Sequence, residues 1–406
     1  MNILLAHNFY QQPGGEDQVF AEEARLLESH GHQVTRFTMD NDAIDGMGRI
    51  GLARKTIWNR ESQAPLRKAI RDSRAQVVHF HNTFPLISPA AYYTAHEEGA
   101  AVVQTLHNYR LICPAATFYR AGGVCEQCLG RAITWPAVRH ACYRDSRPAS
   151  AAITAMLAYH KWKNTWSREV DLYIALTEFA ASKFVQGGFQ KDKVLVKSNF
   201  VDPDPGFGSG DGDYALFVGR LAPEKGVALM IQAWQNPKLG INLKIIGDGP
   251  LRGEVEKAAA SNPQVQYLGR RALSEVYGMM GSARLLVFPS QWYEGQPRTI
   301  LESFAKGTPV VACRLGSMPE LIQPGRTGLL FEPGDACDLA QKVTVLHSGQ
   351  IEQNEMRKNA RKQFEQHFTA AQNYPILLGC YNQALGQLGG ASGQSTPTSQ
   401  DRMQTP

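Results

Sequence analysis

Two basic side chains stand in a loop that suits an anion. Arg220 and Lys225 lie in the segment 219–226, between a predicted strand over 214–218 and the helix that follows it. An arginine offers a planar fork of donors, a lysine offers a point charge, and a helix N-terminus already favours anions. The segment therefore predicts a diphosphate site. Taken singly, each cation suits an ordinary solvated surface equally well.

Two carboxylates follow further along the chain. Glu294 and Glu302 flank the start of a predicted helix near Pro297. One carboxylate can accept hydrogen bonds from both hydroxyls of a ribose, and the other can meet a sugar hydroxyl next to a diphosphate. A nucleotide sugar would satisfy both groups. The alternative is a pair of solvated glutamates, the usual meaning of such a spacing.

A glycine-rich turn lies between these two features. The segment 247–250 reads Gly-Asp-Gly-Pro, and glycines let a backbone approach a ligand closely. With Gly253 the turn forms a loose dinucleotide fingerprint. The next predicted strand ends in Gly269-Arg270-Arg271, without the acidic residue that binds an NAD ribose. The dinucleotide alternative is therefore NADP, held by the two arginines.

Histidine–asparagine pairs follow two predicted strands in the first half of the chain. The pairs are His81 with Asn82 and His107 with Asn108. Because the carboxyl ends of parallel strands meet at one edge of a sheet, these side chains are expected near a pocket. Of the two histidines in the first strand, we expect His81 to be the pocket residue and His79, two residues before it, to be structural. The alternative for each is a histidine that caps a neighbouring loop.

Four of the seven cysteines form a cluster in the sequence, spaced C-x11-C-x2-C-x13-C. These are Cys113, Cys125, Cys128 and Cys142. The C-x2-C knuckle with two outer thiols predicts a structural zinc site. The alternative is four reduced thiols in a loop-rich insertion, because a second C-x2-C pair is absent. Disulfides are not expected without a secretion signal.

Short apolar runs alternate with helical stretches, which predicts parallel α/β sheets. The Pro-, Gly- and Asp-rich segment 202–213 divides two such series. We therefore expect an α/β fold with two doubly wound, Rossmann-like domains facing across a cleft. The expected parts are a domain over 1–201 with a Cys-rich insertion at 111–148 and a long helix near 151–168, a linker at 202–213, a domain over 214–370, a helix at 371–388 that crosses back, and a disordered tail at 389–406.

Composition narrows the functional classes. The 406 residues are 43% hydrophobic and 19% charged, which excludes a disordered chain, and a net charge of +5 is too mild to predict nucleic-acid binding. No apolar stretch approaches ~20 residues and the start lacks a basic leader, so we expect a cytoplasmic protein without a transmembrane helix. The basic segment 51–75 predicts either an amphipathic helix on anionic lipid or a solvated helix face.

In order and spacing, these segments resemble the retaining GT-B glycosyltransferases of family 4 (glycosyl transferases group 1), of the bacterial surface-polysaccharide type. The resemblance spans roughly residues 1–385. It implies that Arg220 and Lys225 hold a nucleotide diphosphate, that Glu294 binds the transferred sugar and that Glu302 binds the ribose. It also implies that His107 contacts the donor sugar. The other implied donor-binding positions are Gly14, Gly15, Gly249, Gln296, Pro297 and Arg298, and the implied acceptor or pocket positions are His81, Asn82 and Asn108.

The resemblance implies a retaining hexosyltransferase acting on a UDP- or GDP-sugar. Its acceptor would be a lipid-linked saccharide or polysaccharide bound by 1–201, with the donor bound by 214–370, at the inner face of the cell membrane. No cofactor is expected for the chemistry. The sequence departs from many relatives at Gln296-Pro297, where an aromatic residue is commoner, and at 196–202, where a Pro-Asn-Gly turn is commoner. The alternatives are an NADP-dependent oxidoreductase and an inactive scaffold of the same fold.

Overall fold

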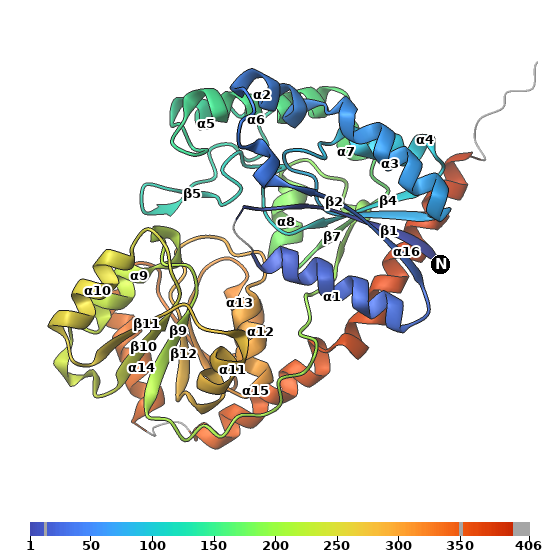
Figure 1. The fold of residues 1–406 in the computed structure, drawn as a ribbon. Coiled ribbons are helices and arrows are strands. Elements are labelled where there is room, and N and C mark those ends of the chain that lie inside the picture. Colours follow the sequence, from blue (N-terminus) through green and yellow to red (C-terminus); the bar gives the residue numbers. More distant parts are fainter. Residues whose placement is uncertain (12–13, 349–351, 393–406) are drawn as a thin grey trace, which may run out of the picture.

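The computed structural model describes residues 1–11, 14–348 and 352–392, and it has two domains, each built on a six-stranded parallel sheet. The two domains stand one above the other in Figure 1, and helices cover their sheets. The expected pair of doubly wound α/β domains is confirmed. No helix in the described part of the chain is both long and apolar enough to span a membrane.

The N-terminal sheet has the strand order β2-β1-β3-β4-β7-β8. Its inner strands β3 and β4 are buried at every residue, including the polar His79, His81 and Asn82 of β3. The strands are β1 (Asn2–Phe9), β2 (Gln33–Asp40), β3 (Val77–Asn82), β4 (Ala101–Leu106), β7 (Leu172–Ala175) and β8 (Val194–Val196). Helices around it include α1 (Gly15–Ser29), α4 (Ala90–Glu97) and α8 (Glu178–Gln186).

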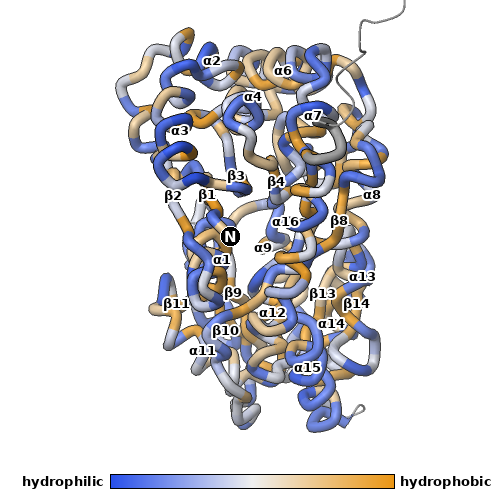
Figure 2. Tube along the Cα trace, turned by 90° about the vertical axis from the view of Figure 1, so that its right-hand side faces the viewer, coloured by the Kyte–Doolittle hydropathy of each residue, from blue (hydrophilic) through white to orange (hydrophobic). Residues whose placement is uncertain are grey.

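The C-terminal sheet has the order β11-β10-β9-β12-β13-β14. The edge strand β14 was not expected, because its four apolar residues lie between two turn-rich segments. The strands are β9 (Tyr214–Val218), β10 (Asn242–Ile246), β11 (Val265–Gly269), β12 (Leu285–Phe288), β13 (Val310–Cys313) and β14 (Gly328–Phe331). The helices are α9 (Val227–Ala233), α10 (Arg252–Ser261), α11 (Leu273–Ser282), α12 (Arg298–Ala305), α13 (Met318–Leu321), α14 (Ala336–His347) and α15 (Gln353–His367), the last largely hydrophilic (Figure 2).

The Cys-rich insertion consists of a short hairpin and helices. Its elements are β5 (Tyr119–Arg120), β6 (Gly123–Val124), α5 (Trp135–Arg139), α6 (Arg147–Trp162) and α7 (Thr165–Arg168). The single long helix expected near 151–168 is wrong. Asn164 takes a left-handed conformation with φ 56°, which interrupts the helix, and Ser146 caps the earlier start of α6 by accepting from the amide of Ala149.

The basic segment 51–75 is not one helix but two, α2 (Arg49–Ile57) and α3 (Arg60–Ser73). Trp58 is extended between them, and the Asn59 side chain starts α3 by accepting from a backbone amide. On α3, Arg67 and Arg71 both form ion pairs with Glu98 of the neighbouring loop. These pairs favour the solvated-face interpretation for α3.

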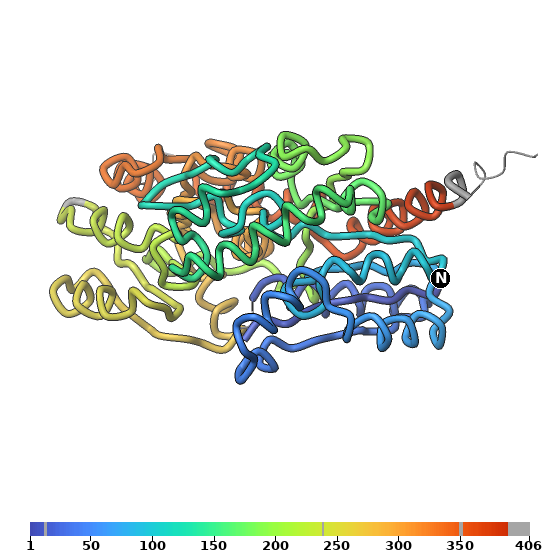
Figure 3. The backbone as a smooth tube through the Cα atoms, turned by 90° about the horizontal axis from the view of Figure 1, so that it is seen from above, coloured from blue at the N-terminus to red at the C-terminus, as the bar shows by residue number. Residues whose placement is uncertain are grey.

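The last described helix, α16 (Ala370–Ser392), returns to the N-terminal domain. Leu377 and Tyr381 join the core that Ile3 and Leu5 form on the N-terminal sheet. Seen from above, this red helix runs beside the N-terminal end of the chain (Figure 3). Because α16 continues to Ser392, the expected disorder from 389 onward is wrong for its first residues, and 393–406 lie outside the described residues.

The segment 202–213 contains neither helix nor strand. It runs along the C-terminal domain, where Arg357 donates to the carbonyl of Gly208 at 2.8 Å. The chain therefore crosses between the domains there and again before α16.

Candidate active site

A cleft of about 580 Å³ lies between the two domains. Its N-terminal wall comes from the loop before α1 and the loop after β4, and its C-terminal wall from the loop after β9 and the segment between β12 and α12. The residues expected at the site that line this cleft are Gly14, Gly15, His107, Asn108, Arg220, Lys225, Glu294, Gln296, Pro297 and Arg298.

Glu294 is the best-anchored carboxylate of the cleft. Its Oε1 accepts from Lys225 Nζ at 2.6 Å, from Ser290 Oγ at 2.6 Å and from Trp292 Nε1 at 2.7 Å. Lys225 also lies 5.0 Å from the centre of the Trp292 ring. Three donors on one oxygen fix the position of the carboxylate and bring the lysine to the cleft.

Arg220 is exposed and lines the cleft. Within the part of the chain that the structure describes, its guanidinium has neither an ion pair nor a hydrogen bond. Its loop is held by the adjacent Leu221, whose amide donates to the carbonyl of Asp248 at 2.9 Å. Of the two cations expected to bind the diphosphate, Lys225 is paired and Arg220 has unused donors.

Gly249 is not among the residues that line the cleft, and its expected contact with donor stays a prediction. A Cβ there would lie 2.5 Å from the carbonyl oxygen of Leu221, and the φ of Gly249 is +157°. Glycine is needed because the two loops pass so closely. Its role is to support the loop that carries Arg220.

The expected ribose carboxylate, Glu302, is buried on α12. Burial raises the pKa of Glu302, although the neighbouring Arg298 acts in the opposite direction. Arg298 Nη2 lies 3.5 Å from Glu302 Oε1. The same guanidinium donates to both oxygens of Glu22 on α1, at 2.6 and 2.9 Å, and to the carbonyl of Phe200 at 3.1 Å. Arg298 thus lines the cleft, and its two terminal nitrogens join the two domains, whereas its Nε has no hydrogen-bond partner in the structure.

Gln296 binds the segment that follows β8 and leaves one donor unused. Its Oε1 accepts from the backbone amide of Asn199 at 2.5 Å. Its Nε2 is buried without a hydrogen-bond partner in the structure. An unpaired buried amide beside the cleft is a ready donor for a ligand oxygen.

The N-terminal wall presents the start of α1. Gly14 and Gly15 lie there, and a Cβ on Gly15 would approach the Arg298 side chain at 3.6 Å. A helix N-terminus carries partial positive charge, so this end complements Arg220 and Lys225 across the cleft.

Glu16, next to the glycine pair, was not expected at the site. It lines the cleft with Tyr10 and Asn108, and burial raises its pKa to about 7, against hydrogen bonds from both of them. Its Oε1 has no partner in the structure. A glutamate directly after paired glycines at a helix start was the available signal.

His81 and Asn82 do not reach this cleft. Asn82 caps its own loop by donating to the carbonyl of Asn8 at 2.7 Å and accepting from the amide of Phe84 at 3.0 Å. His81 lies beneath the cleft, where its Nδ1 is 3.0 Å from Nε2 of His107. Both residues also line a smaller neighbouring hollow of about 40 Å³ together with His107 and Asn108, and their expected ligand contacts stay a prediction.

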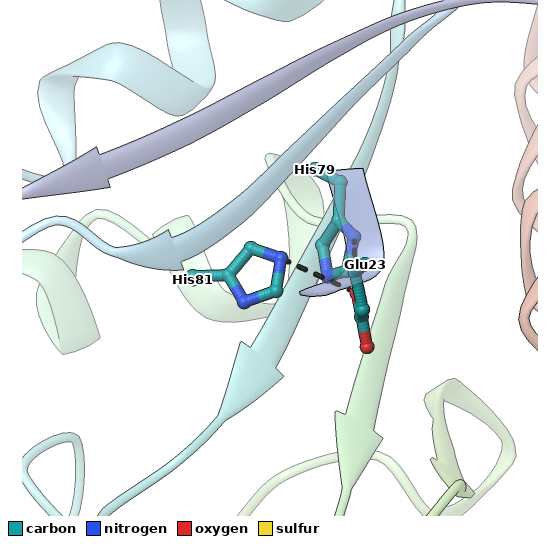
Figure 4. Close-up of side chains that lie close together, drawn as sticks. All are labelled: Glu23, His79 and His81. Atoms are coloured by element: carbon teal, nitrogen blue, oxygen red, sulfur yellow. Dashed lines mark ion pairs between the residues drawn. The ribbon is translucent and has the colours of Figure 1, made fainter. Parts of the chain in front are cut away.

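A buried polar cluster continues below His81 (Figure 4). Among the described residues, Glu23, His79 and His81 are the one group whose potential metal-ligand atoms lie within 4.8 Å of one another. Lys197 donates to Glu23 Oε1 at 2.6 Å, and both ring nitrogens of His79 are bonded, to the hydroxyls of Tyr381 and Thr105. A cation is already supplied by the lysine, so this donor set does not suit a metal ion.

A second hollow, the apolar groove, opens beside the cleft between α2 and α6 and has a volume of about 620 Å³. Tyr10 lines both hollows, so they adjoin. Ile50, which is 74% exposed, stands on the groove. Its lining includes the exposed arginines Arg49, Arg54 and Arg144.

The four clustered cysteines are free thiols in the structure. Cys113 and Cys128 are buried, whereas Cys125 and Cys142 are half-buried. Their sulfurs do not form a group within 4.8 Å of one another, so a shared zinc would need side-chain rotation. The zinc expectation stays a prediction.

Known families match most of the chain. Residues 13–205 match "Glycosyltransferase Family 4" and residues 205–363 match "Glycosyl transferases group 1". An uncharacterised glycosyltransferase of Methanocaldococcus jannaschii is 34% identical over 170 residues, which are 41% of this chain and 46% of that protein. A GDP-mannose-dependent alpha-mannosyltransferase of Mycolicibacterium smegmatis is 30% identical over 263 residues, 62% of this chain and 61% of that protein. The matches thus span under two thirds of these relatives' lengths.

Solved structures share the fold. HepE of Anabaena in complex with UDP superposes with a TM-score of 0.66 at 18% identity, covering 94% of this chain and 100% of that one. The paired domains therefore form a GT-B fold. With two consecutive family matches from 13 to 363, the chain belongs to the family 4 glycosyltransferases.

Proposed function

We propose that this protein transfers a hexosyl group from a nucleoside diphosphate sugar to a lipid-linked acceptor with retention of anomeric configuration. The observation that carries the proposal is the pairing of Arg220 and Lys225 on one wall with the N-terminus of α1 on the other. Support also comes from the relatives, which include a GDP-mannose-dependent mannosyltransferase and a structure holding UDP.

The chemistry asks for stabilisation of a leaving diphosphate. As the bond between the anomeric carbon and the phosphate oxygen breaks, negative charge grows on that oxygen. Arg220, Lys225 and the α1 amides can meet this charge as preorganised donors. The acceptor oxygen forms the new bond on the same face, and its proton passes to the leaving phosphate. Glu294 would hold a hydroxyl of the transferred sugar.

The apolar groove supports a lipid-linked acceptor. An apolar hollow suits a hydrocarbon chain, and Arg49, Arg54 and Arg144 suit a phosphate group at its head. Because Tyr10 borders both hollows, an acceptor seated there would present its sugar at the cleft. The exposed Ile50 and Trp162 would meet a membrane surface at its inner face.

A panel of UDP- and GDP-sugars tests the proposal. The purified protein is incubated with each donor and a lipid-diphosphate saccharide, nucleotide release is followed, and the product anomer is read by NMR. We expect release with at least one donor, and the donor's own anomeric configuration in the product. An inverted product would refute retention. In a thermal-shift assay of the same protein, a higher melting temperature with NADPH but with no nucleotide sugar would refute transfer.

Lys225→Ala separates catalysis from an inactive scaffold. We expect it to lower turnover at least ~100-fold, since it removes a donor to the leaving group. Lys342→Ala is the control, because Lys342 pairs with Asp338 on the outer helix α14, away from the cleft. Equal turnover by Lys225→Ala and wild type would contradict the proposed role.

A further inference from the structure

One aromatic side chain of the C-terminal domain is seated in the N-terminal domain. Tyr293 stands directly before Glu294 in the segment 289–297, which contains neither helix nor strand. Trp292 and Glu294 line the cleft, whereas Tyr293 does not. Its ring packs instead against the hydrophobic core of the N-terminal domain that includes Phe118. Among the described residues, Tyr293 is the only one of the C-terminal domain that joins this core.

Three side chains of the N-terminal domain form the seat for this ring. Phe179, in the first turn of α8, lies edge-on to the Tyr293 ring with the ring centres 4.7 Å apart, and Phe118 of the Cys-rich insertion lies 6.0 Å away. Lys183 Nζ, one turn further along α8, lies 5.5 Å from the centre of the Tyr293 ring and 5.5 Å from that of Phe179. Edge-to-face and cation–π contacts depend on how a ring is turned, so they orient Tyr293 as well as bury it.

The lysine of this seat is held in turn by the Cys-rich insertion. Lys183 Nζ lies 2.7 Å from Oε1 of Glu126, which stands inside the C-x2-C knuckle at 125–128. Burial, with the neighbouring Glu126 carboxylate, raises the pKa of Tyr293 to about 12. The Tyr293 hydroxyl therefore keeps its proton and can donate to that carboxylate. The insertion thus acts on a residue next to Glu294 without lining the cleft through Glu126.

Hydrogen bonds fix the loop backbone on both sides of the Glu294 side chain. Thr177 Oγ1, just before α8, donates to the carbonyl of Gly295 at 3.2 Å. Ser317 Oγ, just before α13, donates to the carbonyl of Glu294 itself at 2.9 Å. Because a segment without secondary structure lacks its own ladder of hydrogen bonds, these tertiary contacts decide where Glu294 stands.

The helices that carry these contacts are themselves joined. Glu320 on α13 accepts from the backbone amides of Glu178 and Phe179 at 3.0 and 2.5 Å, so its carboxylate stands on the N-terminus of α8. A carboxylate at this end of a helix meets its unpaired amides and its partial positive charge. In Figure 1, α8 lies at the lower side of the N-terminal domain, above α13.

The carboxylate of Glu294 and its backbone therefore depend on different domains. Its side-chain partners Lys225, Ser290 and Trp292 all belong to the C-terminal domain. Its loop, in contrast, is seated on the N-terminal domain through Tyr293. Resting on the proposed function, we propose that Tyr293 is a positioning residue, through which the N-terminal domain sets the place of Glu294 for the transferred sugar.

The proposal divides the donor site into two parts. The loop of Arg220 is held within the C-terminal domain, by the bond from the Leu221 amide to the carbonyl of Asp248. Binding of the nucleotide diphosphate should therefore not depend on the seat of Tyr293. Binding of the sugar should depend on it, because a displaced loop takes Glu294 with it.

Indole NMR tests the seat without any ligand. The chain has six tryptophans, and the Nε1–H signal of Trp292 is assigned by its loss in Trp292→Phe. Since this N–H donates to Glu294 Oε1 at 2.7 Å, its chemical shift and its exchange with water report the place of the carboxylate. We expect Phe179→Ala, a change in the opposite domain, to shift this signal and to speed its exchange at least ~10-fold.

Phe37→Ala is the matched control for this measurement. Phe37 is half-buried against the same core as Phe179, but it lies on β2. Its loss should leave the Trp292 signal as in wild type. An unchanged Trp292 signal in Phe179→Ala, or an equal response in both variants, would overturn the inference.

Calorimetry without acceptor tests what the seat does for the donor. The probes are UDP-glucose with UDP and GDP-mannose with GDP. We expect Tyr293→Leu, which removes the ring, to bind the nucleotide sugar at least ~10-fold more weakly, because a small displacement of a positioned group is costly. Its affinity for the free nucleotide should stay as in wild type, and Tyr293→Phe, which keeps the ring, should bind both ligands like wild type. Equal losses for nucleotide sugar and free nucleotide, or no loss, would overturn the inference.

The two measurements separate this inference from the proposed function. A protein that binds none of the four probes but shows the Trp292 response to Phe179→Ala would refute the proposed function and leave Tyr293 as the residue that positions this loop. A protein that turns over a nucleotide sugar but shows no Trp292 response would keep the proposed function and overturn the inference.

Discussion

The ion pair between Glu22 and Arg298 offers a direct test of what holds the two domains together. Glu22 lies on α1 and Arg298 opens α12, and their side chains are 2% and 7% exposed. Two charge-assisted hydrogen bonds, at 2.6 and 2.9 Å, join them. Removing one partner of a buried pair costs about 3–5 kcal/mol, because it leaves the other charge uncompensated.

Glu22→Gln should cost less than that full range. The amide oxygen can keep one of the two hydrogen bonds, and Arg298 retains Glu302 at 3.5 Å and the carbonyl of Phe200 at 3.1 Å. We therefore expect a loss of about 2–4 kcal/mol in the free energy of unfolding. Urea denaturation followed by circular dichroism measures it.

A double-mutant cycle with Arg298→Met isolates the pair from other effects of each change. The exposed pair between Arg36 and Glu28 is the matched control, because it joins α1 to β2 with the same two-bond geometry. Its side chains are about 40% exposed, so its coupling should stay below about 1 kcal/mol. A coupling between Glu22 and Arg298 no larger than that of the control would refute the reasoning.

Three further outcomes are expected. Burial raises the pKa of Glu16 from 4.5 to about 7, so the unfolded chain ionises first and the free energy of unfolding falls as pH rises between these values. Between pH 4.5 and 7.5, the stability of Glu16→Gln relative to wild type should therefore rise by about 2–3 kcal/mol in urea titrations. A difference in stability that does not change with pH would contradict this. Wild-type protein should sediment with anionic vesicles at low salt, and Ile50→Glu should sediment less. Equal sedimentation of the two proteins would contradict contact between the apolar groove and a membrane surface. Zinc at the four-cysteine cluster predicts about one equivalent of metal by elemental analysis, lost in Cys128→Ser, and metal-free protein with four reactive thiols would contradict it.

The strands were predictable because buried parallel strands carry uninterrupted apolar side chains. Runs such as 172–175 and 285–288 lie within β7 and β12. Boundaries that depend on one side chain were missed: Asn59 starts a new helix, and Asn164 ends another. Neither effect alters the hydrophobic pattern that the prediction used.

At the site, local motifs were informative and distant partners were not. Lys225 and Glu294 were each expected from their loops, and the structure joins them at 2.6 Å. Glu23 and Lys197 lie far apart in the sequence, each surrounded by ordinary residues, so no local signal pointed to their buried contact. At Gly249 the structure shows a close loop crossing, which demands the same residue type as the expected ligand approach.

The central claim is that Arg220 and Lys225 bind the diphosphate of a nucleotide sugar. Titration calorimetry with UDP and GDP, using the wild-type protein and Arg220→Ala, tests it most directly. The Arg220 guanidinium has neither an ion pair nor a hydrogen bond in the described structure, so truncating this side chain should leave the fold intact. We expect one of the two nucleotides to bind wild type, and Arg220→Ala to bind it at least ~10-fold more weakly. Equal affinity of the two proteins would contradict the account.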